Sequence, residues 1–102
     1  MDTQEIIERL EAEWDLTNGF LGRLREGTFE PAGLLRFEQL LGSIQLDQKE
    51  PLNPRLVALI WYVPIFMSWQ RERVQECGGN AQDYELACNR ILIIVEQLLG
   101  VP

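Results

Sequence analysis

Three carboxylates near the N-terminus recur at helical spacing, at Glu5, Glu8 and Glu11. Side chains three residues apart lie on one face of a helix, so their oxygens could in principle bind a hard cation such as Ca²⁺. Arg9 interrupts this face and no loop oxygens converge on it, which favours a solvated acidic surface over a metal site. We therefore expect this chain to bind neither a metal nor a cofactor.

The sequence contains no histidine. Histidine is the usual general base near neutral pH and the commonest transition-metal ligand, and the Ser–His and Cys–His nucleophile pairs depend on it. The di-iron bundle proteins need Glu-x-x-His on two helices, so that class is excluded as well. Ser43 and Ser68 lack the surroundings of a nucleophile elbow, and residues 27–33 contain no lysine and no phosphate-loop spacing. We therefore predict that the protein is not an enzyme.

The two cysteines, Cys77 and Cys88, are too few for a disulfide scaffold and lack the spacing of a metal site. If two antiparallel helices meet near Gly79, Cys88 lies opposite about Gln70. Cys77 then lies about 10 Å away along the axis, at a rise of 1.5 Å per residue, which is beyond disulfide reach. We expect two buried, inert thiols, as suits a reducing cytoplasm.

Acidic residues outnumber basic ones, with 16 Asp and Glu against 9 Lys and Arg and a formal net charge of −7. Nucleic acids and anionic membranes are bound mainly by cationic side chains, so we expect neither as a partner. An acidic surface favours a basic protein, unless the charge serves only solubility. The predicted contacts are Glu8, Glu11 and Asp15, with Glu5 and Glu13 as further candidates, because acids are concentrated in this N-terminal segment.

A second candidate surface lies in residues 56–69, which are apolar nearly all round, whereas a helix in a small bundle needs about three apolar positions in seven. One stripe is predicted to face the core and comprises Leu56, Ile60, Val63, Met67 and Val74. A second stripe comprises Val57, Trp61, Ile65 and Trp69. The five consecutive apolar residues at 91–95 repeat this excess.

Two explanations for the second stripe remain open. In one, the helix crosses the centre of the domain, and the first helix and the loops cover both of its faces. In the other, Trp61, Ile65 and Trp69 form an interface for a twin subunit or for a different protein. Trp and Arg are enriched in interface hot spots, and Arg73 follows Trp69 closely. On this second explanation, Arg73 joins the predicted contacts.

Four segments are predicted to be helical and none is predicted to be a strand. The first covers residues 2 or 3 to 26, with a possible split where residues 17–19 weaken it. The second begins at Pro31 and ends near residue 45, followed by a polar loop at 47–50. The third follows the cap Asn53 and continues to Gly78, with a kink at Pro64. The fourth begins after Asn80 and ends before residue 100.

The predicted fold is an all-α, antiparallel, four-helix bundle-like domain covering residues 1–102. The short connection between the third and fourth helices requires these two to be antiparallel. The longest apolar stretch is interrupted by Pro64 and is shorter than the roughly 20 residues that span a bilayer. The N-terminus is acidic where a secretory signal is basic. We therefore expect a cytoplasmic protein.

In size, acidity and helical pattern, and in the aromatic segment Trp-Tyr-Val-Pro at residues 61–64, the chain resembles the immunity proteins of bacterial toxin–immunity pairs. The acidic helical colicin immunity proteins carry a Tyr-Tyr-Pro segment, but its neighbours do not align here, so no functional residue is carried over. The resemblance implies a cytoplasmic bacterial inhibitor that neutralises a toxin, such as a basic toxin domain, by covering it. The alternative function is a homodimeric structural or adaptor protein.

Overall fold

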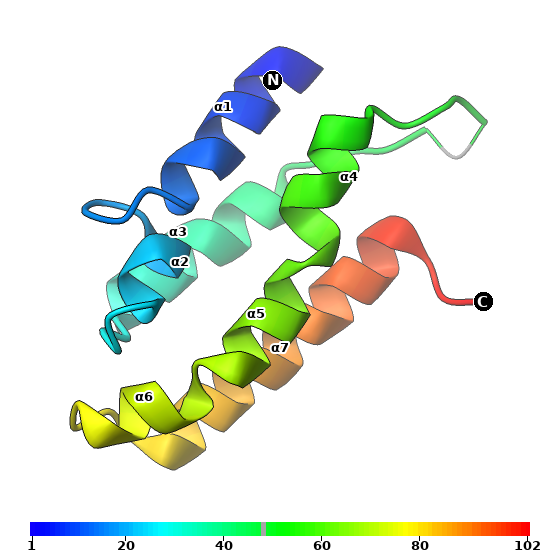
Figure 1. Cartoon of the computed structure of the whole chain (residues 1–102). Helices are drawn as coiled ribbons and strands as arrows, with labels where there is room; N and C mark the ends of the chain where they lie inside the picture. The colour runs from blue at the N-terminus through cyan, green and yellow to red at the C-terminus, as the bar shows by residue number, and fades with distance from the viewer. Residues whose placement is uncertain (48) are drawn as a thin grey trace.

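The computed structural model describes residues 1–47 and 49–102. These residues form helices and no strand, so the predicted all-α class is confirmed. The described helices are α1 (Thr3–Glu13), α2 (Phe20–Leu24), α3 (Pro31–Gly42), α4 (Pro54–Trp61), α5 (Val63–Trp69), α6 (Arg71–Glu76) and α7 (Ala81–Leu99) (Figure 1). Among them, no helix combines the length and the apolarity that crossing a membrane requires.

Side-chain caps set the start of three helices. The Asp2 carboxylate accepts a hydrogen bond from the backbone N–H of Glu5 at 2.8 Å and caps α1. Asn53 caps α4, and Asn80 caps α7 by accepting from the N–H of Asp83 at 2.9 Å. Each cap satisfies an N–H group that has no partner inside its helix. The caps predicted at Asn53 and Asn80 are confirmed.

The first predicted helix is divided into α1 and α2. After α1, the carboxylate of Asp15 accepts hydrogen bonds from the N–H groups of Thr17 and Asn18, at 3.1 and 2.8 Å. Such a local turn competes with the helical hydrogen bonds and ends the helix. The second predicted helix is α3, which ends at Gly42, a little before the predicted end. The loop predicted at residues 47–50 includes Gln48, which lies outside the described residues.

The third predicted helix consists of three shorter ones, separated at Tyr62 and Gln70. Pro64 lies in the first turn of α5, where its missing N–H leaves no helical hydrogen bond unmade. Tyr62 keeps right-handed helical torsions (φ −78°, ψ −17°), and Figure 1 shows α4, α5 and α6 following one another along the molecule. The described residues therefore form more and shorter helices than the four predicted.

The helices pack in a chain of neighbours. α1 packs against α4 and α3, α3 packs against α7, and α7 returns alongside α6 and α5 (Figure 1). The Cα radius of gyration is 13.6 Å, close to the roughly 13 Å of a compact chain of this length. The inward stripe predicted for the third segment is confirmed as buried: Leu56, Ile60, Val63, Met67 and Val74. Within residues 91–95, by contrast, Leu92 and Ile93 are exposed.

Candidate partner-binding face

The second stripe of the third segment lies at the surface. Trp61 is 49% exposed, Ile65 38% and Trp69 68%, while Val57 is half-buried. The explanation in which both faces of this segment are covered is therefore wrong. A tryptophan with half or more of its surface in water leaves a large apolar area available for another contact.

The two exposed tryptophans pack against further aromatic side chains. We call the whole group the aromatic cluster, and its members are Trp14, Trp61, Tyr62, Phe66 and Trp69. The ring of Tyr62 meets Trp61 edge to face at 5.5 Å and Trp69 at 6.1 Å between centroids. Trp14, from the end of α1, stacks on Tyr62 at 6.3 Å. These arrangements suit the quadrupoles of the rings. Tyr62 therefore links the two exposed tryptophans to α1.

A groove of about 620 Å³ lies beside the aromatic cluster, between α1 and α4. We call it the acidic groove, and its lining residues are Glu8, Glu11, Ala12, Trp14, Asp15, Arg25, Arg55, Ala58, Leu59 and Tyr62. All three acids predicted as contacts in the first helix line it. Because Trp14 and Tyr62 belong to both the groove and the cluster, two sets of residues predicted separately lie on one continuous face.

The carboxylates of the acidic groove differ in their partners. Glu11 accepts a hydrogen bond from Arg55 at 3.1 Å, which balances its charge. Among residues 1–47 and 49–102, Glu8 accepts a hydrogen bond only from the neutral amide of Gln4, at 3.3 Å, and Asp15 accepts only from backbone N–H groups. Within the described residues, neither Glu8 nor Asp15 forms an ion pair. Two exposed negative charges are therefore available to a partner.

Arg25 also lies in this groove, and its role could not be deduced from the sequence. Its guanidinium carbon lies 5.2 Å from the ring centroid of Phe66 and 6.0 Å from that of Trp14, a cation–π geometry. Arg73, predicted as a contact, donates a hydrogen bond to the backbone carbonyl of Arg25 at 2.7 Å. Arg73 thus connects α6 to the end of α2. The packing of α2 against α5 and α1 brings Arg25 to these rings.

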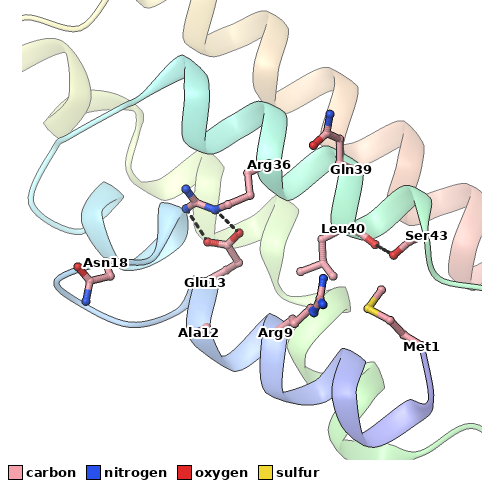
Figure 2. Close-up of a pocket in the computed structure, with 9 residues that line it drawn as sticks. All are labelled: Met1, Arg9, Ala12, Glu13, Asn18, Arg36, Gln39, Leu40 and Ser43. Atoms are coloured by element: carbon pink, nitrogen blue, oxygen red, sulfur yellow. Dashed lines mark hydrogen bonds and ion pairs between the residues drawn. The ribbon is translucent and has the colours of Figure 1, made fainter.

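Glu13 does not belong to the exposed acidic surface, although the sequence made it a candidate. Its carboxylate is buried and accepts two hydrogen bonds from Arg36, at 3.0 and 2.8 Å (Figure 2). It also accepts one from the N–H of Phe20 at 3.1 Å. The hydrogen bonds to Glu13 raise the pKa of the Arg36 guanidinium. Glu13 and Arg36 also line a second pocket of about 420 Å³ between α1 and α3. Glu13 therefore ties helices together.

The two cysteines are free thiols, so the expectation that they do not pair is confirmed. Cys88 is buried, and burial raises the pKa of its thiol. Burial also raises the pKa of Tyr84, whose hydroxyl donates a hydrogen bond to the Met67 carbonyl at 2.6 Å. Cys77 is exposed, so the expectation that it is buried is wrong. It lies in the turn after α6, close to the carbonyl of Glu26.

No protein-family model, no curated protein and no solved structure matches this chain. The most distinctive surface in the described part of the chain combines the aromatic cluster with the acidic groove. Exposed aromatic rings beside carboxylates that lack a cationic partner suit the binding of a basic, partly apolar surface.

Proposed function

We propose that this protein is a binding module that recognises another protein through the aromatic cluster and the adjoining acidic groove. The observation that carries the proposal is the exposure of Trp61, Ile65 and Trp69 along one stripe. Large apolar side chains gathered on the surface of a small protein mark interaction sites, and tryptophan is among the commonest hot-spot residues. The aromatic contacts of Tyr62 hold both tryptophans in place before a partner arrives.

The charges indicate a basic partner. The net charge is −7, and the carboxylates of Glu8 and Asp15 have no cationic partner in the described chain. Such charges beside an apolar centre accelerate encounter with a positive surface and disfavour negative ones. The partner we propose is a protein with a basic surface around an apolar patch.

Among acidic binding modules, we propose the class of immunity or antitoxin-type inhibitors, acting in the bacterial cytoplasm against a toxin. Two features support this choice. The chain resembles such proteins in size, charge and helical pattern, and the Trp-Tyr-Val-Pro segment at 61–64 contributes Trp61 and Tyr62 to the aromatic cluster. Inhibition would follow from covering a basic toxin surface, without any catalysis and without a metal or cofactor.

The proposal includes an architecture: an antiparallel four-helix bundle-like unit, in which α4, α5 and α6 act as one rod bent near Pro64. The right-handed helical torsions of Tyr62 support this continuity between α4 and α5. Trp61 lies before the break at Tyr62 and Trp69 lies after it, yet both rings contact Tyr62. The bend would therefore shape the binding face by directing the two tryptophans to one ring.

The second candidate function is a homodimeric structural or adaptor protein, in which the same stripe is the dimer seam. The exposed stripe favours it as well, because a face of this kind can pack against its own copy. The oligomeric state distinguishes the two functions. A concentration-dependent mass of twice 11.8 kDa, lowered by substitution of Trp69, would favour the dimer.

Trp69→Ala tests the proposed function. Because Trp69 is 68% exposed, the variant should fold with a stability close to that of the wild type. If Trp69 is a hot spot, binding of the partner should weaken by about 2 kcal/mol or more, roughly 30-fold. Leu86→Ala is the matched control, since Leu86 is 57% exposed on α7 and lies outside the aromatic cluster.

The measurement begins with tagged wild-type protein used to capture partners from the native host, identified by mass spectrometry. Each captured protein is then purified, and calorimetry gives its dissociation constants for the wild type and the two variants. Its toxicity to growing cells is measured with and without the wild-type chain. A basic toxin that is neutralised by the wild type and bound weakly by Trp69→Ala supports the proposal. Equal binding by all three proteins would contradict it.

A further inference from the structure

We infer that the acidic groove is a binding site for an arginine side chain of the partner, and that Arg25 occupies part of this site in the free protein. The inference deepens the proposed function and rests on it, because it names the chemistry that the partner contributes. The guanidinium of Arg25 already lies over aromatic rings, and Arg25 itself lines a groove that carboxylates also line.

The aromatic part of the site is formed by Trp14 and Tyr62, which line the groove, and by the buried ring of Phe66 beside them. Trp14 meets Phe66 edge to face at 4.9 Å and stacks on Tyr62 at 6.3 Å, so the three rings form one continuous surface. The indole N–H of Trp14 donates to the carbonyl of Leu59 at 3.4 Å, which anchors the ring against α4. The position of the Arg25 guanidinium over two of these rings shows that a planar cation fits there.

The polar part of the site is not used by Arg25. Within the described part of the chain, the guanidinium of Arg25 donates no hydrogen bond to any carboxylate. In the same groove, Glu11 pairs with Arg55, whereas Glu8 and Asp15 have no cationic partner among the residues that the structure describes. A guanidinium that stacks on the rings and also bonds a carboxylate gains contacts that Arg25 lacks.

Arg25 is therefore an incomplete intramolecular ligand. It is exposed, and its side chain lies over the rings of Trp14 and Phe66 without a hydrogen bond to any other described side chain. An arginine from a partner can displace it into water at the cost of its two cation–π contacts, re-form these contacts with its own guanidinium, and gain charge-assisted hydrogen bonds as well. Removing the Arg25 charge should remove this competition and one repulsive charge, so that arginine binds about two- to fivefold more tightly.

N-acetyl-arginine amide serves as the probe, titrated into ¹⁵N-labelled protein while NMR follows the indole N–H signal of Trp14. N-acetyl-citrulline amide has nearly the same shape without the charge and is the control ligand. The test variant is Arg25→Gln. Arg9→Gln is the matched control, because it removes the same charge from an arginine that pairs with Glu5 outside the groove.

The arginine derivative should shift the Trp14 signal in the wild type, and Arg25→Gln should bind it two- to fivefold more tightly than Arg9→Gln does. Asp15→Asn keeps the oxygen that forms the turn but loses the charge, and it should weaken binding. Equal shifts with the citrulline derivative, or equal affinities of Arg25→Gln and Arg9→Gln, would overturn the inference. The wild-type comparison of the two ligands decides the question even if Arg25→Gln does not fold.

Failure here is distinguishable from failure of the proposed function. The titration requires no partner protein, and it reports on Trp14 rather than Trp69. Suppose that the arginine derivative does not bind, while Trp69→Ala binds a captured toxin more weakly than the wild type does. The proposed binding function is then supported and the arginine site is contradicted. If arginine binds but Trp69→Ala binds the partner normally, the groove is a cation site and the exposed stripe is not the interface.

Discussion

Glu8 and Glu13 are both carboxylates of α1, but the fold gives them opposite roles. Glu8 is exposed in the acidic groove, whereas Glu13 is buried and bonded to Arg36 and Phe20. Five residues on a helix correspond to more than one turn, so the two side chains point to different sides. Residue type alone could not distinguish them, because the distinction depends on where α3 and α2 pack.

At this scale we predict that Glu13→Ala lowers the free energy of unfolding by about 1–3 kcal/mol, because it leaves the buried N–H of Phe20 without an acceptor. Glu13→Gln should cost less, since its amide oxygen can still accept. Glu5→Ala is the control, as the exposed Glu5–Arg9 pair should contribute less than about 0.5 kcal/mol. Urea denaturation measures all three, and equal losses for Glu13→Ala and Glu5→Ala would contradict the structural role of Glu13.

The two thiols should differ in reactivity. Cys77 is exposed, whereas Cys88 is buried with a raised pKa, which keeps it protonated. A thiol reagent at mildly alkaline pH should therefore label Cys77 quickly in the native protein and Cys88 only when the chain unfolds. Mass spectrometry of the labelled peptides, with Cys77→Ser as the control, checks this. Rapid labelling of Cys88 in the native protein would contradict the buried position of its thiol.

At the scale of elements, the turn between α1 and α2 depends on a close approach between two backbone segments, at Gly22 and at Asp15. A Cβ atom placed on Gly22 would lie 1.9 Å from the carbonyl oxygen of Asp15, so any side chain there must displace backbone. The sequence marked this region only as a place where the first helix weakens. The glycine is needed because α2 lies directly against the backbone of Asp15 and Leu16 in the turn that follows α1.

We therefore predict that Gly22→Ala lowers the free energy of unfolding by about 1–3 kcal/mol through overpacking. Gly42→Ala is the matched control, because a Cβ there meets nothing within 4 Å and the backbone φ is not positive. That substitution should raise stability by about 0.4–1 kcal/mol by restricting the unfolded chain. Thermal melts of both variants test the prediction. If both substitutions change the stability in the same direction, the close backbone approach at Gly22 is contradicted.

At the scale of the whole molecule, the acidic groove should govern the speed of association with a basic partner. Raising the salt concentration from about 0.05 to about 0.5 M should slow association strongly and change dissociation much less, because exposed charges are screened. Neutralising Glu8, Glu11 and Asp15 together should produce the same slowing at low salt. Surface plasmon resonance with the captured partner gives both rates.

The control for this prediction removes the same number of charges elsewhere, as Glu50→Gln, Glu72→Gln and Glu76→Gln, all exposed and outside the acidic groove. Both triple variants lose the same net charge, so a general effect of acidity would slow them equally. Slowing confined to the groove variant would identify the groove as the steering surface. An association rate indifferent to salt and to both variants would leave the acidity as a means of solubility.

Much of the local structure follows from the sequence because its causes are local. The caps Asn53 and Asn80 and the buried stripe of the third segment were predictable, since capping and helical periodicity depend on residues a few positions apart. The same periodicity separated Trp61 and Trp69 from the core residues, although it could not say whether another element covers them.

Only the tertiary structure decided how these pieces combine. The contact of α1 with α4 joins the acidic groove to the aromatic cluster, the contact of α2 with α5 seats Arg25 on the rings, and the contact of α1 with α3 buries Glu13. None of these contacts leaves a periodic signal, because each joins residues far apart in the chain through packing. The sequence by itself determined which faces are apolar and where helices begin, and packing determined which faces remain available to a partner.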